Sequence, residues 1–314
     1  MSAMKHKATK PPALRPGDTI GIMAPSSRID KKALKSAVKA LEAEGFKVYI
    51  HPQTYAEHGQ SAGAAQEKAD ALHDLYRNPD IKAIFTAHGG NRCGWLLDLL
   101  DYDLIRENPK ILIGYSDVTA LLGAIHKKTG TPTFHGPSAI RIDKSFGENQ
   151  LRQCFNLLKG EQADIPLGDA AILHEGEAAG KLIGGNLSLI CSLMGTPYEP
   201  DFEGAILFLE DCSEELSRID RMFAQLRNAG VFDKISGLVI GGFTDLKDTG
   251  KKPFGLTLTD IVNEAIAGKN ISAVAMNAPF GHEDDLYTLP IGLKATLVTK
   301  GKPKLKLDAP AVAL

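Results

Sequence analysis

The sequence of 314 residues predicts an α/β protein with an N-terminal doubly wound parallel-sheet domain and a C-terminal β-rich α+β domain. Three observations support this prediction. The length exceeds the roughly 100 to 200 residues of one ordinary domain. In the first half, short apolar β-branched runs alternate with amphipathic segments, which is typical of parallel strands joined by right-handed crossovers. In the second half strands predominate, and the last of them alternate like an antiparallel pair.

The first domain is expected to cover residues 1–145 and to begin with the apolar strand DTIGIMA, from Asp18. Leu34, Val38 and Leu41 then recur at helical spacing until Gly45 ends the pattern. Strands and helices continue to alternate in KVYI (strand), residues 62–76 (helix), IKAIFTA (strand), a helix from Trp95, KILIG (strand) and DVTALLGAIHKK (helix).

Residues 146–168 form the predicted linker, because one helix from Glu148 to Leu158 is followed by the polar segment KGEQADIPLGD. The second domain is expected to cover residues 169–314, and Gly230 is expected to end its longest helix. Its elements are AAILHE, AGKLIG, GAILFLE and GLVIGGF (strands), NLSLICSLMG and SEELSRIDRMFAQLRNAG (helices) and the final pair in LPIGLKATLVTKGKPKLKLD.

Composition and charge exclude several classes of protein. Lys and Arg total 36 against 38 Asp and Glu, so the net charge of -2 provides no field to hold nucleic acid or an anionic membrane. No stretch approaches the roughly 18 apolar residues of a membrane span, and the N-terminus lacks the apolar region of a signal peptide. The 4 cysteines are widely spaced without a C-x-x-C motif, which fits a reducing compartment. We therefore expect a cytoplasmic protein.

Ser116 is the strongest candidate for chemistry, because it stands where the apolar strand ILIG ends and a helix begins. Ligands of open α/β sheets bind beyond the carboxyl ends of the strands. A serine on such a turn resembles a nucleophile elbow, although the glycine that usually follows is missing. The alternative is a helix N-cap, whose hydroxyl accepts from the amide of Val118 or Thr119.

A serine nucleophile needs a base and a group that orients the base. His282 follows the apolar run SAVAMN, and Glu210 closes the run GAILFLE. Each has an ordinary alternative: a surface-loop histidine, and an acidic residue favoured by the next helix's dipole. Together the three residues follow the order Ser, Glu, His, which α/β-hydrolases also use.

Glycine is unusually frequent, with 31 residues, and Gly89 and Gly90 are expected to form a turn directly after IKAIFTA. This turn lacks the Lys-Ser/Thr of a phosphate-binding loop. It is either a second source of oxyanion-binding amides or a tight turn that allows close packing. The cluster His282-Glu283-Asp284-Asp285 lacks metal-site spacing and is interpreted as a solvated acidic loop, so we expect no metal and no cofactor.

Five long segments together resemble one family: LRPGDTIGIMAPSS, NPKILIGYSDVTALL with FHGP, GKLIGGNLSLICSLMGTPYEPDFEGAILFLED, RIDRMFAQLRNAGVFDKISGLVIGGF and FGHEDDLYTLPIG. They resemble the LD-carboxypeptidase (muramoyltetrapeptide carboxypeptidase) family of serine peptidases, over nearly the whole chain.

The resemblance implies that Ser116 is the nucleophile, His282 the general base and Glu210 its orienting carboxylate. It also implies an oxyanion hole from the amide of Asp117 and one amide of the Gly89-Gly90 turn. Members of the family are typically homodimeric, metal-independent and cytoplasmic, and they remove the terminal D-alanine from murein tetrapeptide during cell-wall recycling.

The sequence departs from the family pattern beside the glycine turn. Many members have Arg-Gly-Gly-Tyr-Gly where this chain has His88-Gly89-Gly90-Asn91-Arg92. Backbone roles survive this change, whereas the substrate contacts of the replaced arginine and tyrosine stay open, as does the question whether Arg92 occupies an equivalent place. Two other functions therefore stay open: a microcin-immunity-type peptidase that cleaves a peptidyl-nucleotide antibiotic, and a non-catalytic module that binds cell-wall peptides.

Overall fold

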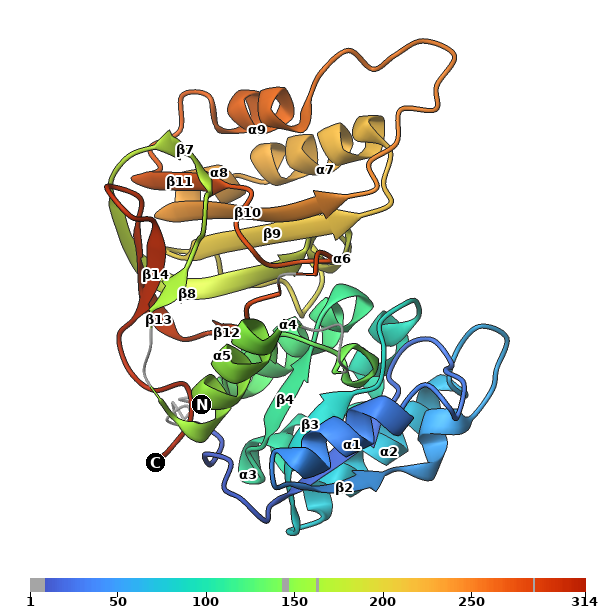
Figure 1. Cartoon of the computed structure of the whole chain (residues 1–314). Helices are drawn as coiled ribbons and strands as arrows, with labels where there is room; N and C mark the ends of the chain where they lie inside the picture. The colour runs from blue at the N-terminus through green and yellow to red at the C-terminus, as the bar shows by residue number, and fades with distance from the viewer. Residues whose placement is uncertain (1–8, 143–146, 162–163, 285) are drawn as a thin grey trace, which may run out of the picture. The chain divides into compact units, whose positions relative to one another are not determined.

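The computed structural model describes residues 9–142, 147–161, 164–284 and 286–314, and the chain forms two compact units (Figure 1). Unit 1 comprises Met1–Gln162, Thr288–Gly292 and Pro310–Leu314, and unit 2 comprises Ala163–Tyr287 and Leu293–Ala309. Each unit contains one sheet with its own apolar core. No helix among the described residues is long and apolar enough to cross a membrane.

Unit 1 is a doubly wound α/β unit, as the sequence predicts. Its six-stranded sheet has the order β12-β5-β4-β3-β1-β2, and the five strands β1 to β5 are parallel. Their order 2-1-3-4-5 is a common doubly wound order, in which ligands bind beside β1 and β3, where the direction of winding changes. The strands are β1 (Thr19–Met23), β2 (Lys47–Ile50), β3 (Ile81–Thr86), β4 (Ile111–Gly114), β5 (Thr133–His135) and the antiparallel β12 (Leu289–Ile291).

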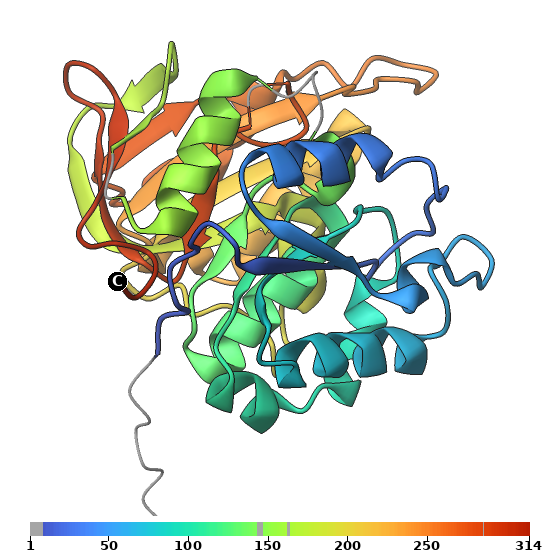
Figure 2. The same cartoon turned by 60° about the horizontal axis from the view of Figure 1, so that its bottom comes forward.

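Helices cover both faces of this sheet. They are α1 (Lys35–Ala43), α2 (Ala65–Arg77), α3 (Tyr102–Glu107), α4 (Thr119–Thr129) and α5 (Glu148–Lys159). Figure 2 shows α1 and α5 on one face and α2 and α3 on the other. Phe46, just after α1, and Phe155 of α5 have ring centroids 5.5 Å apart, which joins the two helices of the first face. The apolar faces expected from the sequence are thus buried against β-branched strands that are covered on both sides.

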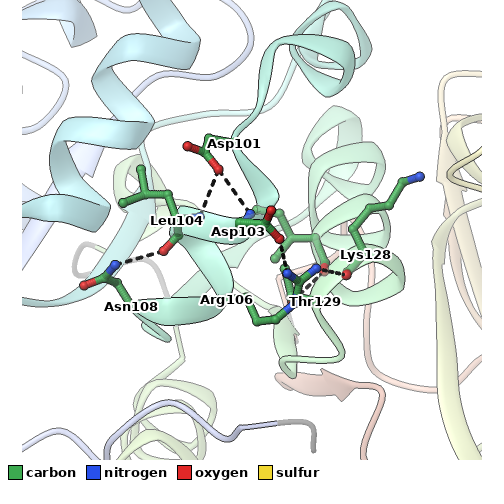
Figure 3. A network of polar contacts seen from close by, with 8 residues as sticks. Asp101, Asp103, Leu104, Arg106, Asn108, Lys128 and Thr129 are labelled. Carbon is green, nitrogen blue, oxygen red and sulfur yellow. Dashed lines mark hydrogen bonds and ion pairs between the residues drawn. The ribbon is translucent and has the colours of Figure 1, made fainter. Parts of the chain in front are cut away.

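A polar network fixes α3 to the end of α4 (Figure 3). The carboxylate of Asp101 accepts hydrogen bonds from the amides of Asp103 and Leu104, which makes it the N-cap of α3. Arg106 forms an ion pair with Asp103 and donates to the carbonyl of Lys128 at 2.7 Å. Because α4 follows the short turn that begins at Ser116, this network helps to hold the helix that leads away from the candidate nucleophile.

Unit 2 contains an eight-stranded mixed sheet of order β6-β14-β13-β8-β9-β10-β11-β7. The central strands β8 to β11 are parallel, and the flanking pairs are antiparallel. Residues 177–181 of β8 pair with β13, and residues 182–186 pair with β9, so β8 joins the two parts of the sheet. The strands are β6 (Ile165–Pro166), β7 (Ala171–His174), β8 (Glu177–Asn186), β9 (Ile206–Cys212), β10 (Gly237–Thr244), β11 (Ala273–Met276), β13 (Lys294–Val298) and β14 (Lys304–Leu307).

The helices of unit 2 are short apart from one. They are α6 (Leu187–Leu193), α7 (Leu216–Asn228), α8 (Val231–Lys234) and α9 (Leu258–Ile266). In Figure 1, α7 and α9 lie side by side over the sheet. Gly230 follows the end of α7 with a φ of 73°, the left-handed conformation expected of a terminating glycine.

The observed units differ from the expected domain boundaries at the linker, at the segment LPI and at Pro310–Leu314, which belongs to unit 1 instead of the expected second domain. The helix expected within the linker, α5, belongs to unit 1, and residues 165–166 already form the edge strand β6 of unit 2. The segment LPI, expected in the antiparallel pair of the second domain, forms β12 in unit 1 instead. β12 pairs with β5 and thereby covers what would otherwise be an open edge. Residues 1–8, 143–146 and 162–163 of these expected regions lie outside the described residues.

Two smaller differences concern local structure. The helix expected from Trp95 is a 3₁₀ helix over Cys93–Leu99, followed separately by α3. The short strand β5 and the helix α9 are not among the expected elements. β5 has only three residues, TFH, and its two polar ends hide the apolar pattern that identifies a strand.

Candidate active site

Ser116 lies at the carboxyl end of β4 with an unusual backbone conformation. Its φ is 63°, in the left-handed region, and it begins the 3₁₀ turn Ser116–Val118 that runs into α4. This conformation costs a non-glycine residue about 1–2 kcal/mol, and such strain concentrates at functional sites. A strained strand-to-helix turn that presents a serine is the defining geometry of a nucleophile elbow.

The structure does not support the N-cap interpretation of Ser116. An N-cap residue has an extended backbone and its side chain accepts a hydrogen bond from the following turn. The extended residue at this position is Tyr115, and neither the 3₁₀ turn nor α4 begins with a side-chain cap. The hydroxyl of Ser116 is therefore not used to start the helix.

The glycine turn after β3 lies directly against Ser116. A Cβ on Gly89 would come within 2.8 Å of the Ser116 Cβ and 3.0 Å of its Oγ. Gly90 has a φ of +113°, and a Cβ there would lie 2.0 Å from the Oγ of Ser27, in the loop after β1. Only glycine fits both positions, so the sequence Gly-Gly allows this turn to approach the serine.

Two hydrogen bonds attach the same turn to the loop after β1. The amide of Ser27 donates to the carbonyl of Gly89 at 3.2 Å, and its Oγ accepts from the amide of Asn91 at 3.2 Å. The turn therefore lies between the ends of β1 and β4, beside the place where doubly wound sheets bind ligands.

Asp117 has a second function that its predicted oxyanion role does not include. Its side chain is buried, and Oδ2 accepts a hydrogen bond from the amide of Cys93 at 2.9 Å. Lys68 of α2 is also buried and donates to Ser61 Oγ at 2.9 Å and to the carbonyl of Arg92 at 3.2 Å. Together these contacts tie the loop after the glycine turn to the residue that follows Ser116.

Burial lowers the pKa of Lys68, and the neighbouring Cys93 and Asp117 partly offset that effect. Lys68 is not among the site residues that the sequence predicts. Its one signal is a charged residue among Ala69, Leu72 and other apolar positions of α2, and this signal does not reveal which loops enclose it.

Glu210 and the half-buried His282 form a hydrogen-bonded pair in unit 2. Glu210 Oε2 lies 2.7 Å from Nδ1 of His282, and the glutamate side chain is fully buried. Gly281 has a φ of +122°, and a Cβ there would come within 3.0 Å of the Glu210 Cβ. Glycine thus allows the loop that carries His282 to close over the end of β9.

This pairing determines which nitrogen of His282 acts as a base. A carboxylate at Nδ1 holds the proton on that nitrogen and leaves Nε2 as the basic nitrogen of the ring. Burial by itself would lower the pKa of His282, but hydrogen bonds to Cys212 and Glu210 and their charges outweigh it, so the pKa is raised. The pair is therefore arranged to accept a proton and to stabilise the resulting imidazolium.

Asp211, next to Glu210, faces the opposite side of β9 and stabilises the start of α6. It accepts hydrogen bonds from Asn186 Nδ2 at 2.9 Å and from the amides of Ser188 and Cys212 at 3.0 and 2.8 Å. Burial raises its pKa to about 6 despite these hydrogen bonds. Asp211 is thus a structural acid that fixes the strand end on which Glu210 lies.

The six predicted site residues fall into two groups. Unit 1 brings together Ser116, Asp117, Gly89 and Gly90, and unit 2 brings together Glu210 and His282. Within the part of the chain that the structure describes, no three His, Cys, Asp or Glu side chains form a metal-binding group. Asp285 of the acidic loop lies outside the described residues.

Comparison with known proteins gives consistent matches across the chain. Residues 20–136 match the LD-carboxypeptidase N-terminal domain and residues 179–297 match the LD-carboxypeptidase C-terminal domain. A probable murein peptide carboxypeptidase of Bacillus subtilis is 36% identical over 298 residues, which cover 93% of this chain and 92% of the relative.

Two solved structures extend these matches to the fold. The microcin C7 self-immunity protein MccF aligns with a TM-score of 0.88 at 29% identity, over 96% of this chain and 98% of MccF. A muramoyltetrapeptide carboxypeptidase from Oxalobacter formigenes aligns with a TM-score of 0.81 at 28% identity, over 93% of this chain and 99% of that protein. With both domains matched and a relative above 30% identity over nearly its whole length, this chain belongs to the LD-carboxypeptidase family of serine peptidases.

Proposed function

We propose that the chain is a serine carboxypeptidase that releases the terminal D-alanine of murein tetrapeptide, with Ser116, His282 and Glu210 as its catalytic triad. The observation that carries this proposal is the 2.7 Å contact between the buried carboxylate of Glu210 and Nδ1 of His282. In serine peptidases a buried carboxylate in this position orients the histidine base and stabilises its protonated form. The strained Ser116, next to a glycine turn, supplies the matching nucleophile.

In the proposed reaction, Nε2 of His282 takes the proton of Ser116 as Oγ attacks the carbonyl between the L-centre of the diamino acid and D-alanine. The amide of Asp117 and an amide of the Gly89-Gly90 turn stabilise the oxyanion. The imidazolium then donates its proton to the departing amine of D-alanine, and an acyl-enzyme remains. Water, activated by the same nitrogen, hydrolyses this ester and regenerates Ser116.

This reaction requires His282 of unit 2 to act on Ser116 of unit 1. None of these steps uses a metal ion. We also propose that the protein acts in the cytoplasm and that it forms a homodimer. Analytical ultracentrifugation of the purified chain would test the homodimer.

The proposal is tested by mass spectrometry of murein tetrapeptide incubated with the wild type or with Ser116→Ala. The wild type should release D-alanine in the presence of a chelator, and the variant should lose activity by several orders of magnitude while it stays folded. Ser192→Ala, which changes an exposed serine on α6, is the matched control and should keep full activity. Full activity of Ser116→Ala would refute the assignment, and a wild type without any turnover would favour a peptide-binding module.

A second candidate substrate is a peptidyl-nucleotide antibiotic of the microcin type. Two observations favour it: the 31% identity to the Escherichia coli microcin C7 self-immunity protein, and the replaced side chains around the glycine turn. In that loop Arg92 has a φ of 77° and its guanidinium lies 5.3 Å from the ring centroid of Trp95, which is 66% exposed. An exposed indole of this kind can stack on a flat base.

Competition between the two substrates on one preparation separates these candidates. We expect the tetrapeptide to have the higher kcat/KM. A higher kcat/KM for an aminoacyl sulfamoyl nucleoside, lowered by Trp95→Ala, would assign the antibiotic substrate instead.

A further inference from the structure

The peptide bond between Arg92 and Cys93, just after the glycine turn, is held at both ends by charged side chains. Its carbonyl accepts a hydrogen bond from Lys68 Nζ at 3.2 Å, and its amide donates to Asp117 Oδ2 at 2.9 Å. The bond is trans, so the carbonyl and the amide point in opposite directions and the two side chains approach from opposite sides. We call this arrangement the Lys68–Asp117 clamp.

Both side chains of the clamp are withdrawn from solvent. Lys68 is 1% exposed and Asp117 is 6% exposed. Buried charged groups are tolerated when they are hydrogen-bonded, but apolar side chains of similar volume often stabilise a protein as well or better. The clamp is therefore better explained by the geometry that it gives to the loop than by a gain in stability.

The clamp holds the end of the Gly89-Gly90 turn that leads into the 3₁₀ helix. Arg92 has a φ of 77°, and a non-glycine residue keeps such a conformation only when the surrounding structure determines it. The beginning of the turn is attached separately, through the two hydrogen bonds between Ser27 and the turn. With both ends held, the amides of the turn keep one orientation.

Lys68 also supports the loop after β1. It donates to Ser61 Oγ at 2.9 Å, and that hydroxyl donates to the carbonyl of Ser26 at 3.4 Å. The amide of Ala62 donates to the same carbonyl at 3.0 Å. Because Ser27 is the next residue, this one lysine is connected to both attachments of the glycine turn.

Asp117 connects the same turn to the candidate nucleophile. Its backbone amide, directly after Ser116, is one proposed oxyanion donor. Its side chain holds the loop that follows the Gly89-Gly90 turn, where the other proposed donor lies. One residue thus determines the position of both donors, one through its backbone and the other through its carboxylate.

We propose that Lys68 and Asp117 are positioning residues for the oxyanion hole: by clamping the Arg92–Cys93 peptide they fix the Gly89-Gly90 turn relative to the amide of Asp117. This inference rests on the proposed function, because it assigns a support to the proposed oxyanion hole. Neither side chain contacts the substrate in this role. Loss of the clamp should lower kcat more than it raises KM, since the oxyanion forms only in the transition state.

The first test follows the loop through the fluorescence of Trp95, the only tryptophan of the chain. Trp95 lies two residues beyond the clamped peptide, and the Arg92 guanidinium lies 5.3 Å from its ring centroid. Lys68→Met removes the donor to the carbonyl of Arg92, so the emission maximum of Trp95 should shift and its quenching by acrylamide should change. Lys68→Arg keeps a charged donor and should restore the wild-type spectrum in part.

Lys110→Met is the matched control. Lys110 is also a buried lysine of unit 1, but it precedes β4 at the opposite end of that strand from Ser116. It donates to the carbonyls of Leu75 and Asn78, at the end of α2. Lys110→Met should lose a similar set of buried hydrogen bonds and leave both the fluorescence of Trp95 and kcat unchanged.

Unchanged Trp95 fluorescence in folded Lys68→Met would overturn the proposal. This readout needs no turnover, so it separates a failure of the inference from a failure of the proposed function. If Lys68→Met does not fold, Lys68→Gln carries the same test, because its side chain is neutral and one bond shorter. A wild-type spectrum in Lys68→Gln would then count against the clamp.

Kinetics on murein tetrapeptide add a second measurement. In Lys68→Met kcat should fall by about 10- to 100-fold while KM changes by less than about twofold, below the loss expected for removal of a whole oxyanion donor. Asp117→Asn should act in the same direction, and the double variant should lose less than the product of the two single effects, because both side chains hold one peptide. Independent effects of the two substitutions, or an equal loss of kcat in Lys110→Met, would overturn the proposal.

Discussion

The two units produce their functional groups in different ways. Unit 1 makes its candidate nucleophile from local backbone geometry: a left-handed serine at a strand end, with two glycines fitted against it. Unit 2 makes its candidate base from a long-range contact, since Glu210 and His282 are 72 residues apart and meet inside a buried strand end. The first depends on conformational strain and the second on burial and charge, so each should respond to a different kind of mutation.

The largest expected effect on activity comes from removing the negative charge of Glu210. Glu210→Gln keeps the shape of the side chain but removes the charge that fixes the His282 tautomer, so kcat should fall by roughly 10³- to 10⁴-fold. Loss of the carboxylate also removes one cause of the raised pKa of His282, so the histidine should titrate at lower pH. Steady-state kinetics and NMR titration check the two effects, and unchanged kcat would show that Glu210 has no catalytic role.

The second largest expected effect comes from adding a methyl group to the glycine turn beside Ser116. Gly89→Ala would place a methyl group against the Cβ and Oγ of Ser116, so activity should fall by about 100-fold, as expected when a reacting group is displaced by about 1 Å. Gly94→Ala is the matched control, because a Cβ there meets nothing within 4 Å. Equal activity in the two variants would show that the turn does not position the serine.

A third prediction uses pH to separate activity from stability. The raised pKa of His282 means that its contribution to stability is complete below its unfolded pKa of about 6.5 and is lost as pH rises through the folded value. Activity requires the neutral ring and should change in the opposite direction, increasing about tenfold per pH unit below the folded pKa. Urea unfolding of the wild type and His282→Gln at acidic and alkaline pH, beside a kcat/KM profile, checks both trends.

The unfolding free energy of the wild type relative to His282→Gln should therefore decrease as pH rises through the folded pKa of His282. A wild type that gains stability relative to His282→Gln as pH rises would contradict the assignment of a charged histidine beside Glu210.

The smallest expected effect is the stability difference that measures the backbone strain at Ser116. Ser116→Gly and Ser116→Ala both lack the nucleophile, but glycine adopts a φ of 63° without strain. After the greater chain entropy of unfolded glycine is subtracted, Ser116→Gly should be more stable than Ser116→Ala by about 0.5–1 kcal/mol. Urea denaturation measures this difference, and a more stable alanine variant would argue against stored strain.

These contrasts also explain what the sequence could predict. The alternation of apolar runs and helices identified most elements of unit 1, because strand and helix patterns are local. Ser116 was recognisable for the same reason, as a polar residue between an apolar strand and a helix. Glu210 and His282 each follow an apolar run, and their chain order with Ser116 suggested a partnership that the family resemblance then assigned to them; their catalytic roles stay a prediction.

The features that sequence analysis missed depend on contacts between distant segments. The burial of Lys68 requires Ser61 and Arg92 to close around it, and no local pattern records that. The position of β12 depends on an open edge beside β5 that exists only after the sheet forms.

The path of β12 also affects how the protein is made. Unit 1 begins near the N-terminus, yet its last edge strand and its final segment, Pro310–Leu314, come from the end of the chain. On the ribosome, the sheet that carries Ser116 cannot be completed until β12 has been synthesised, after residues 163–287 of unit 2. The nascent chain must therefore hold an unfinished, edge-exposed sheet during synthesis of unit 2, and a fragment that stops at Gln162 would inherit the same exposed edge permanently.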